Sequence, residues 1–460
     1  MGLNGSVILI ELNELTPSLI SRFMQAGALP NFQRFFRESQ VFTTDAAETG
    51  LRLNPWIQWV TVHTGLPLDE HGVMLLGERP KAAVSGLVDQ VAEAGGRVWM
   101  CGSMNIPFQA PLPGAALPDP WSADTAPFPE DLERYLRVVR HHVQEHTNPD
   151  SRLGAGDYLN FGAFMATHGL APSTVWAAAR QLARERGGRF GWKRIGILDR
   201  LQFDLFRHYH RRIRPHLSTF FTNSVAHMQH TRWRNLEPER FEVKPSASEQ
   251  AEFHDAVEFA YRENDAMLGR FLAFAGPDTT LVFLTALSQQ PDARWEDIGG
   301  KRFYRPRDFP RLVAFAGITG PHECAPVMSE EFWLRFDDEA SAQRAARQLE
   351  ALQVDGKRAF RAERRAREIY TGCDLSGAVA TDAKLVSAET GAAAPFYELL
   401  YQAETLKSGV HHPDGVLWIR RPDRRHQVHA SKAPLTAVAP TVLRMLGVEI
   451  PSSMKEAPLL

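Results

Sequence analysis

Short apolar runs alternate with helical segments along this chain and constrain its fold more than any other feature. The first run, 7–10, precedes a helix expected over 17–26, with Pro17 in its first turn and Gly27 after its end. Similar runs occupy 97–102 and 279–287. Runs of this kind are typical of strands that are buried on both faces. We therefore expect an α/β protein whose mostly parallel central sheet is flanked by helices.

The length of 460 residues suits one large core that carries insertions. Residues 127–215 read as helical, and 184–214 contain ten Arg or Lys against three acidic residues. Such a segment is typical either of a solvated basic helix face or of a cap that attracts an anionic substrate. Residues 327–400 mix strand-like and charged helical sequence. The expected organisation is a core in three parts, 1–126, 216–326 and 401–460, interrupted by a helical basic cap at 127–215 and a small α/β insertion at 327–400.

Composition excludes several classes of protein. The net charge of −2 gives no reason to expect nucleic acid as a partner. Three widely spaced cysteines form neither a disulfide framework nor a zinc cluster. The first apolar run is too short for a signal peptide or a membrane span, so we expect a cytoplasmic protein without a membrane span.

Six short motifs follow one another in a recognisable order. They are Gly27-x-Leu29-Pro30-Asn31, Trp59 with Thr64-Gly65, Pro67 and His71-Gly72, AHMQHTRW at 226–233, YRENDAMLGRFL at 261–272, Gly409-Val-His411, and VAPTVLRMLGVEIPSSM at 438–454. In this order they resemble the type I phosphodiesterase/nucleotide pyrophosphatase branch of the alkaline phosphatase superfamily. The resemblance implies an alkaline-phosphatase-like core in which two metal ions, held by Asp and His, assist attack by a Ser or Thr.

Two parts of the site that this resemblance implies are missing. The position of the nucleophile falls on Pro55, and its neighbours Asn54 and Trp56 also lack a hydroxyl group. The Asp-His pair that should follow the late strand is replaced by ALSQQ at 286–290, and Ser and Gln are poor ligands for a divalent ion. The sequence therefore predicts a rebuilt or single-metal site that hydrolyses a simple aryl phosphodiester very slowly.

The rest of the metal site is retained according to the same resemblance. It places ligands at Glu11, which ends the first strand, and at His230 and His411. A carboxylate and two imidazoles are a suitable set for one Zn²⁺ or Mn²⁺ ion with an open position. Asn13 and Glu14 could add ligands or hydrogen bonds. The alternatives are that Glu11 stabilises the following helix and that each histidine is an ordinary buried side chain.

Other candidates would move protons or bind substrate. Because no hydroxyl nucleophile is present, a water molecule would attack the substrate directly. His227, His230 or His412 would then act as the acid or base.

Substrate contacts are expected from Asn13, Asn54 and Lys407, and the expected substrate is small and anionic or phosphorylated. The sequence thus favours a metal-dependent hydrolase or transferase acting on a phosphate- or sulfate-type ester. The alternative is a catalytically inactive relative, with or without metal, that binds a phosphorylated or sugar ligand or a protein partner.

Overall fold

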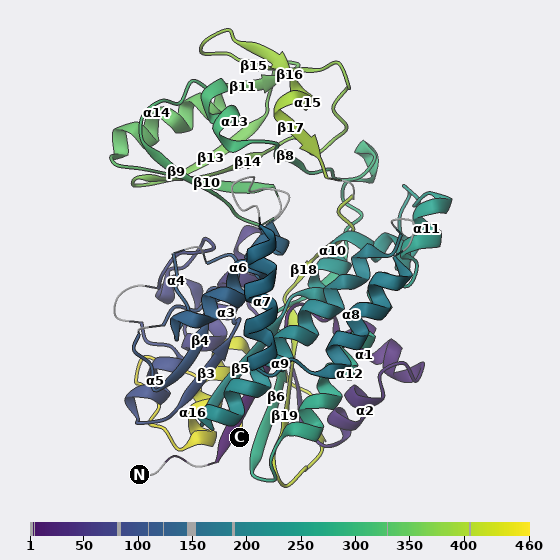
Figure 1. The fold of residues 1–460 in the computed structure, drawn as a ribbon, viewed down its shortest axis with the longest axis vertical. Coiled ribbons are helices and arrows are strands. Elements are labelled where there is room, and N and C mark those ends of the chain that lie inside the picture. The colour runs from purple at the N-terminus through teal and green to yellow at the C-terminus, as the bar shows by residue number, and fades with distance from the viewer. Residues whose placement is uncertain are drawn as a thin grey trace.

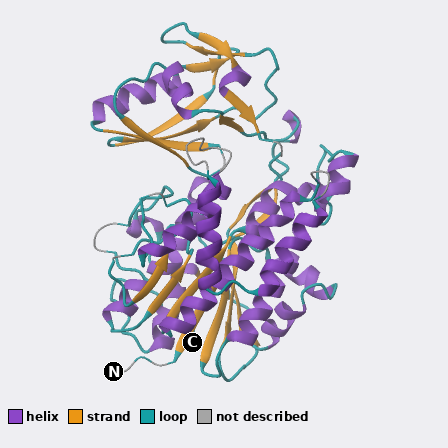
Figure 2. Ribbon diagram, in the orientation of Figure 1, coloured by secondary structure: helices purple, strands orange, loops and turns teal. Residues whose placement is uncertain are grey.

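The computed structural model describes all residues except 1, 2, 4, 81–83, 109, 123, 145–152, 186–188, 329, 404 and 405. Its centre is one large sheet with helices on both faces (Figures 1 and 2). The strand order is β20-β2-β19-β6-β1-β5-β3-β4, with β21 also pairing with β2. Of the described strands in this sheet, β19 alone runs antiparallel to its neighbours. The expected α/β fold with a mostly parallel central sheet is confirmed.

The strands of the central sheet are short and largely buried. They are β1 (Ser6–Leu12), β2 (Gln40–Asp45), β3 (Val98–Cys101), β4 (Gly114–Leu117), β5 (Leu217–Thr222), β6 (Thr279–Leu284), β19 (Asp414–Arg420), β20 (Gln427–Val428) and β21 (Ala433–Pro434). A separate two-stranded ribbon is made by β7 (Ser288–Pro291) and β18 (Gly409–His412).

Alternation along the strands divides the core into two layers. In β1, Ile8 and Ile10 pack into one hydrophobic cluster, whereas Val7 and Leu9 pack into the other. The first layer contains residues of α1 (Pro17–Gln25), α2 (Pro30–Arg37), α6 (Glu133–Gln144), α7 (Ala155–Thr167), α9 (Ile195–Ile213), α10 (Ser224–Leu236) and α12 (Ala256–Phe274). The second contains residues of α3 (Pro55–Thr64), α5 (Leu87–Glu93) and α16 (Val438–Leu446).

The remaining described α-helices of the core region are α4 (Leu68–His71), α8 (Pro172–Arg184) and α11 (Ala247–Phe253). Among the described residues, no helix is both long enough and apolar enough to cross a membrane.

The described part of 127–215 is helical, but its last helix is part of the core. Phe203 and Phe206 of α9 pack edge-on against Phe220 of β5, with ring centroids 6.1 and 5.5 Å apart. Trp99 of β3 donates its indole N–H to the carbonyl of Phe206 at 3.1 Å. Because these aromatic side chains need a sheet face to cover them, α9 lies on the sheet rather than beyond its edge.

A smaller α/β unit is inserted between β6 and β19 and lies at one end of the core (Figure 1). It has its own hydrophobic core, whose members run from Tyr304 to Leu400. Its elements are β8 (Tyr304–Pro306), α13 (Phe309–Phe315), β9 (His322–Pro326), β10 (Glu331–Phe336), α14 (Glu339–Glu350), β11 (Leu352–Val354), β12 (Lys357–Arg358), β13 (Phe360–Arg365), β14 (Glu368–Cys373), β15 (Lys384–Ser387), β16 (Ala393–Pro395), α15 (Phe396–Leu399) and β17 (Leu400–Gln402).

The Gly-x-Leu-Pro-Asn motif forms the start of α2, which is capped from a distant helix. Pro30 begins the helix, where a missing N–H costs nothing. The carboxylate of Asp265 on α12 accepts the backbone N–H groups of Asn31 and Phe32 at 2.9 and 2.8 Å. It also accepts the side-chain amide of Asn31 at 2.8 Å. One buried carboxylate therefore supplies the cap that the local sequence lacks.

Replacing Asp265 by alanine should lower the free energy of unfolding by about 2–3 kcal/mol, because three donors would lose a charged acceptor. Urea denaturation would measure the change. Exposed Glu239, replaced in the same way, is the control and should have almost no effect. A loss at Asp265 no larger than at Glu239 would show that water replaces the cap.

Candidate metal centre

Glu14 lies in the turn that follows β1, at the edge of the sheet where ligands of parallel sheets usually bind. Its backbone adopts a φ of 63°, which is uncommon for a residue with a side chain and often found at functional sites. Asn13 donates to its Oε1 at 2.9 Å, and Gln289 donates to its Oε2 at 2.5 Å. Gln229 donates to its backbone carbonyl at 2.8 Å. The carboxylate is therefore held in one orientation although its backbone conformation is unfavourable.

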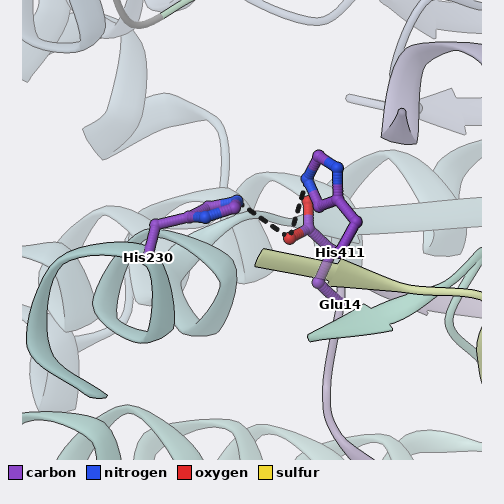
Figure 3. Close-up of side chains that lie close together, drawn as sticks. All are labelled: Glu14, His230 and His411. Atoms are coloured by element: carbon purple, nitrogen blue, oxygen red, sulfur yellow. Dashed lines mark ion pairs between the residues drawn. The ribbon is translucent and has the colours of Figure 1, made fainter. Parts of the chain in front are cut away.

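Two imidazoles point at the same oxygen of Glu14 (Figure 3). The Nε2 atoms of His230 and His411 lie 3.1 and 3.5 Å from Glu14 Oε2. Within the described residues, one potential ligand atom from each of the three side chains lies within 4.8 Å of the others. His230 comes from α10 and His411 from β18, so residues separated by almost 400 positions meet here.

Backbone carbonyl groups fix the tautomer of both histidines. His230 donates from Nδ1 to the carbonyl of Gly409 at 3.0 Å, and His411 donates from Nδ1 to the carbonyl of Leu53 at 2.8 Å. A neutral imidazole that donates from Nδ1 has a lone pair on Nε2. Two lone pairs then face a carboxylate oxygen that can itself only accept. Such an arrangement requires a proton or a cation between the groups, and it is the usual orientation of metal-binding histidines.

Burial and charge set protonation states that suit a metal ligand. Burial lowers the pKa of His411 to about 4, although the carboxylate of Glu14 opposes this shift. Burial alone would raise the pKa of Glu14, but the positive charge possible on His411 and His230, with their hydrogen bonds and that of Gln289, lowers it to about 2. At neutral pH the centre therefore offers an anionic carboxylate and a neutral imidazole, the forms that bind divalent cations.

Of the three side chains, the carboxylate is buried and the two imidazoles are partly exposed to solvent. The side chain of Glu14 is 1% exposed, whereas those of His411 and His230 are 17% and 27% exposed. Three protein ligands with one accessible side are typical of catalytic metal sites, since structural sites are usually closed by a fourth ligand.

Gly409 is needed for the close approach of the ribbon to α10. A Cβ atom at this position would lie 2.2 Å from Oε1 of Gln289 and 2.6 Å from the carbonyl of Gln229. β18 pairs with β7 so that His411 lies opposite Gln289. The Gly-x-His motif therefore places an imidazole beside Glu14 and keeps the space beside Gln289 free.

Glu11 is not the carboxylate of this centre, which corrects the ligand assignment made from the sequence. Strand alternation directs Glu11 to the face of β1 that α3 covers. There its Oε1 lies 2.8 Å from Nε2 of His63, and its Oε2 accepts the hydroxyl of Ser103 at 2.7 Å. Glu11 is completely buried in this network, and Glu14 takes the position expected for it.

Asn13, a predicted substrate contact, makes hydrogen bonds inside the protein. It is completely buried, and its amide nitrogen donates to Glu14 and to Asn223 at 2.9 and 2.8 Å. Its oxygen accepts the indole N–H of Trp59 at 2.8 Å. These internal hydrogen bonds show that Asn13 orients Glu14, and its contact with substrate stays a prediction.

The start of α3 lies beside the centre, as the resemblance requires of a nucleophile position. Leu53, whose carbonyl accepts from His411, is two residues before Pro55, the first residue of α3. Asn54 is half-buried and donates to the carbonyl of Leu51 at 2.7 Å. Its contact with substrate stays a prediction. On the other side, Gln289 occupies the segment where an Asp-His pair was missing.

Two further candidates, His227 and His412, are close in sequence to the two histidines of the centre. His227 is exposed on α10, one turn before His230. His412 follows His411 on β18, so its side chain points to the opposite face of the ribbon, and its Nδ1 accepts the N–H of Asp414 at 3.1 Å. The acid or base roles of these two residues stay predictions.

Lys407 lies next to the centre through its backbone. The N–H of the following residue, Ser408, donates to the carbonyl of His230 at 2.8 Å. Burial lowers the pKa of Lys407, and the nearby ammonium group of Lys301 lowers it further. Its contact with substrate also stays a prediction.

Sequence reasoning missed several groups that orient the ligands. Gln229 and Gln289 hold Glu14, and the carbonyl groups of Leu53 and Gly409 hold the histidines. Only Gly409 left a signal, as part of the Gly-x-His motif. The other groups are common residue types or backbone atoms, which carry no pattern.

Comparison with known proteins gives structural similarities only. No family model and no curated protein matches the chain. Many solved structures are similar to it, and three of them are described next. Phosphonoacetate hydrolase from Sinorhizobium meliloti 1021 with phosphonoformate is 12% identical, covers 97% of this chain and 96% of its own, and has a TM-score of 0.45. The same enzyme with phosphonoacetate is 11% identical, with the same coverage and a TM-score of 0.42. Phosphonate monoester hydrolase SpPMH from Silicibacter pomeroyi is 12% identical, covers 99% of this chain and 76% of its own, and has a TM-score of 0.44. Similarities this low assign no function and no site residue to this chain.

Proposed function

We propose that this protein is a hydrolase or transferase that acts on a phosphate- or sulfate-type ester with one divalent metal ion. One observation carries the proposal: two tautomer-fixed Nε2 atoms converge on one oxygen of Glu14. The class of substrate rests on the motifs that resemble the type I phosphodiesterase branch of the alkaline phosphatase superfamily.

Zn²⁺ or Mn²⁺ fits the donor set, because both accept two imidazoles and a carboxylate and leave a position for substrate or water. Bound there, such an ion would act as a Lewis acid on an oxygen of the ester. His230 and His411 would be kept in the binding orientation by their Nδ1–H bonds. Lys407 is one residue before the segment that binds α10. Its ammonium group would attract the anionic group of the substrate.

The residues around α3 favour direct attack by water. Positions 54–56 supply an amide, a pyrrolidine ring and an indole, none of which can form a covalent phosphoryl or sulfuryl intermediate. His227, one turn before His230, and His412, next to His411 in the chain, are the proposed proton-transfer groups. A hydrolase built in this way would have one metal ion and no phosphoryl- or sulfuryl-enzyme step.

A non-catalytic binding protein is the second candidate, and one observation favours it. Pro55 and Gln289 stand beside the centre at the positions where the resemblance implies a nucleophile and a second metal ligand. Loss of either part of such a set usually lowers the rate by orders of magnitude. A binding protein would retain the metal and the affinity for an anion but not turnover.

The two candidates are separated by turnover in the presence of metal. Metal-stripped protein would receive Zn²⁺ or Mn²⁺ and be assayed with aryl phosphate monoesters and diesters, aryl phosphonate monoesters and aryl sulfates. We expect metal-dependent hydrolysis of at least one class, with the simple aryl phosphodiester among the slowest. The unchanged protein without metal is the control. Stoichiometric metal binding without hydrolysis of any class would favour the binding protein, and rapid hydrolysis of the diester would contradict the proposed site.

A further inference from the structure

Exposed apolar side chains are concentrated on two consecutive helices of 127–215. The exposed fractions are 46% and 73% for Tyr158 and Leu159 on α7, and 51%, 71% and 59% for Val175, Trp176 and Leu182 on α8. Of the described large apolar side chains that are exposed, only Leu51, Ile298 and Val428 lie elsewhere. We call the exposed sides of α7 and α8, which carry these five residues, the α7–α8 surface.

The orientation of α8 is the reverse of that expected for a helix that covers a core. Its buried residues include Thr174 and Gln181, whereas Val175, Trp176 and Leu182 face outward. The side-chain amide of Gln181 donates to Glu185 and to the carbonyl of Phe190, both at 2.8 Å. The amide of Gln181 is thus hydrogen-bonded inside the protein, whereas the buried hydroxyl of Thr174 has no partner among the described residues. The apolar side of α8 is left for solvent or a partner.

α7 has the same character. Phe164 and Met165 are its buried residues, and its outward side carries Leu159 together with small residues such as Ala163 and Ala166. The turn between α7 and α8 is fastened to α9, because Asp204 accepts the N–H of Ala171 at 2.9 Å. The two helices are therefore fixed to the core with their apolar sides outward.

The charges on this surface are positive. Arg180 and Arg184 are exposed on α8, and no ion pair joins either of them to another described residue. The two acidic side chains at the ends of the helices are already paired, Asp157 with Arg137 at 3.4 Å and Glu185 with Arg194 at 2.5 Å. Exposed Trp, Leu and Val beside unpaired Arg are the composition of helices that lie in the interface of an anionic bilayer.

We propose that the α7–α8 surface binds peripherally to membranes that contain anionic phospholipids. The apolar side chains would enter the headgroup region, and the two arginines would contact lipid phosphates. A symmetric contact with a second copy of the chain is less suitable, because it would bring the arginines of both copies, four positive charges, into one interface. The proposal is independent of the metal centre, since none of its residues contacts that site.

Vesicle sedimentation of the full chain tests the proposal. We expect binding to vesicles of phosphatidylcholine with phosphatidylglycerol, and little binding to phosphatidylcholine alone or at high salt. Leu159→Ser with Trp176→Ser should weaken binding to the anionic vesicles by about tenfold or more. Arg180→Glu with Arg184→Glu should do the same by reversing the charge.

Matched variants separate this surface from general hydrophobicity and charge. Ile298→Ser with Val428→Ser removes two exposed apolar side chains elsewhere, and Arg344→Glu with Arg347→Glu makes the same charge change on α14; both should bind like the unchanged protein. Circular dichroism would show that all variants are folded. Binding that is absent in the unchanged protein, or equal in all variants, would overturn the proposal. So would concentration-dependent dimerisation without lipid that Leu159→Ser with Trp176→Ser abolishes, because it would identify a second copy as the occupant.

Discussion

Replacing His411 by alanine is expected to lower the affinity of the protein for Zn²⁺ or Mn²⁺ by about 100-fold or more. Changes to groups that only orient a ligand typically cost 10–100-fold, and loss of the ligand itself should cost at least as much. His411 supplies one of the two Nε2 atoms that face Oε2 of Glu14. Calorimetric titration of metal-stripped protein would measure the affinity.

His412→Ala is the matched control, because its side chain leaves the same strand on the opposite face. This variant should bind metal like the unchanged protein, whatever its effect on turnover. Equal metal affinity in His411→Ala and the unchanged protein, with both folded, would show that the three side chains do not form the metal site. Undiminished hydrolysis in His411→Ala would likewise place the chemistry elsewhere.

Replacing Glu11 by alanine is expected to lower the free energy of unfolding by about 3–5 kcal/mol, because it breaks a buried pair and leaves one partner unsatisfied. His63 is itself buried, and its Nε2 would lose the carboxylate at 2.8 Å. The hydroxyl of Ser103 would lose its acceptor at 2.7 Å. Urea denaturation of metal-free protein would measure the loss.

The double variant Glu11→Leu with His63→Leu tests the cause of this loss. If the penalty arises from the unpaired imidazole, apolar replacement of both partners should restore much of the stability. Metal affinity should be unchanged in Glu11→Ala once the protein is folded. The opposite result, normal stability with lost metal binding, would mean that Glu11 and not Glu14 is the ligand.

The motifs around the site were readable because each depends on local geometry. In Gly409-Val-His411 the glycine is required by a close approach of the backbone. The position of His230, three residues before Trp233, is a helical spacing. Pro55 and the neutral residues at 286–290 were readable for the same reason, since a missing hydroxyl or carboxylate is visible in the sequence itself. From these features the sequence predicted both imidazoles, the missing nucleophile and the missing Asp-His pair.

The choice between the carboxylates could not be made in the same way. Glu11 and Glu14 both lie at the end of the first apolar run, and both are compatible with a ligand at that edge of the sheet. The choice depends on the direction of each side chain. Strand alternation turns Glu11 under α3, and a left-handed backbone conformation turns Glu14 toward α10 and β18. That conformation is maintained by Gln229 and Gln289, which are more than 200 positions away.

The sequence by itself determined the α/β class and the alternation of strands and helices, because periodicity depends on neighbouring residues. Its short motifs predicted both histidines of the proposed centre. Only the tertiary structure decided that Glu14 completes the centre, that α9 covers the sheet and that α8 turns its apolar side outward. The physical reason is that side-chain direction and burial depend on what packs against each element. Those contacts join residues that are distant in the chain, and no local pattern records them.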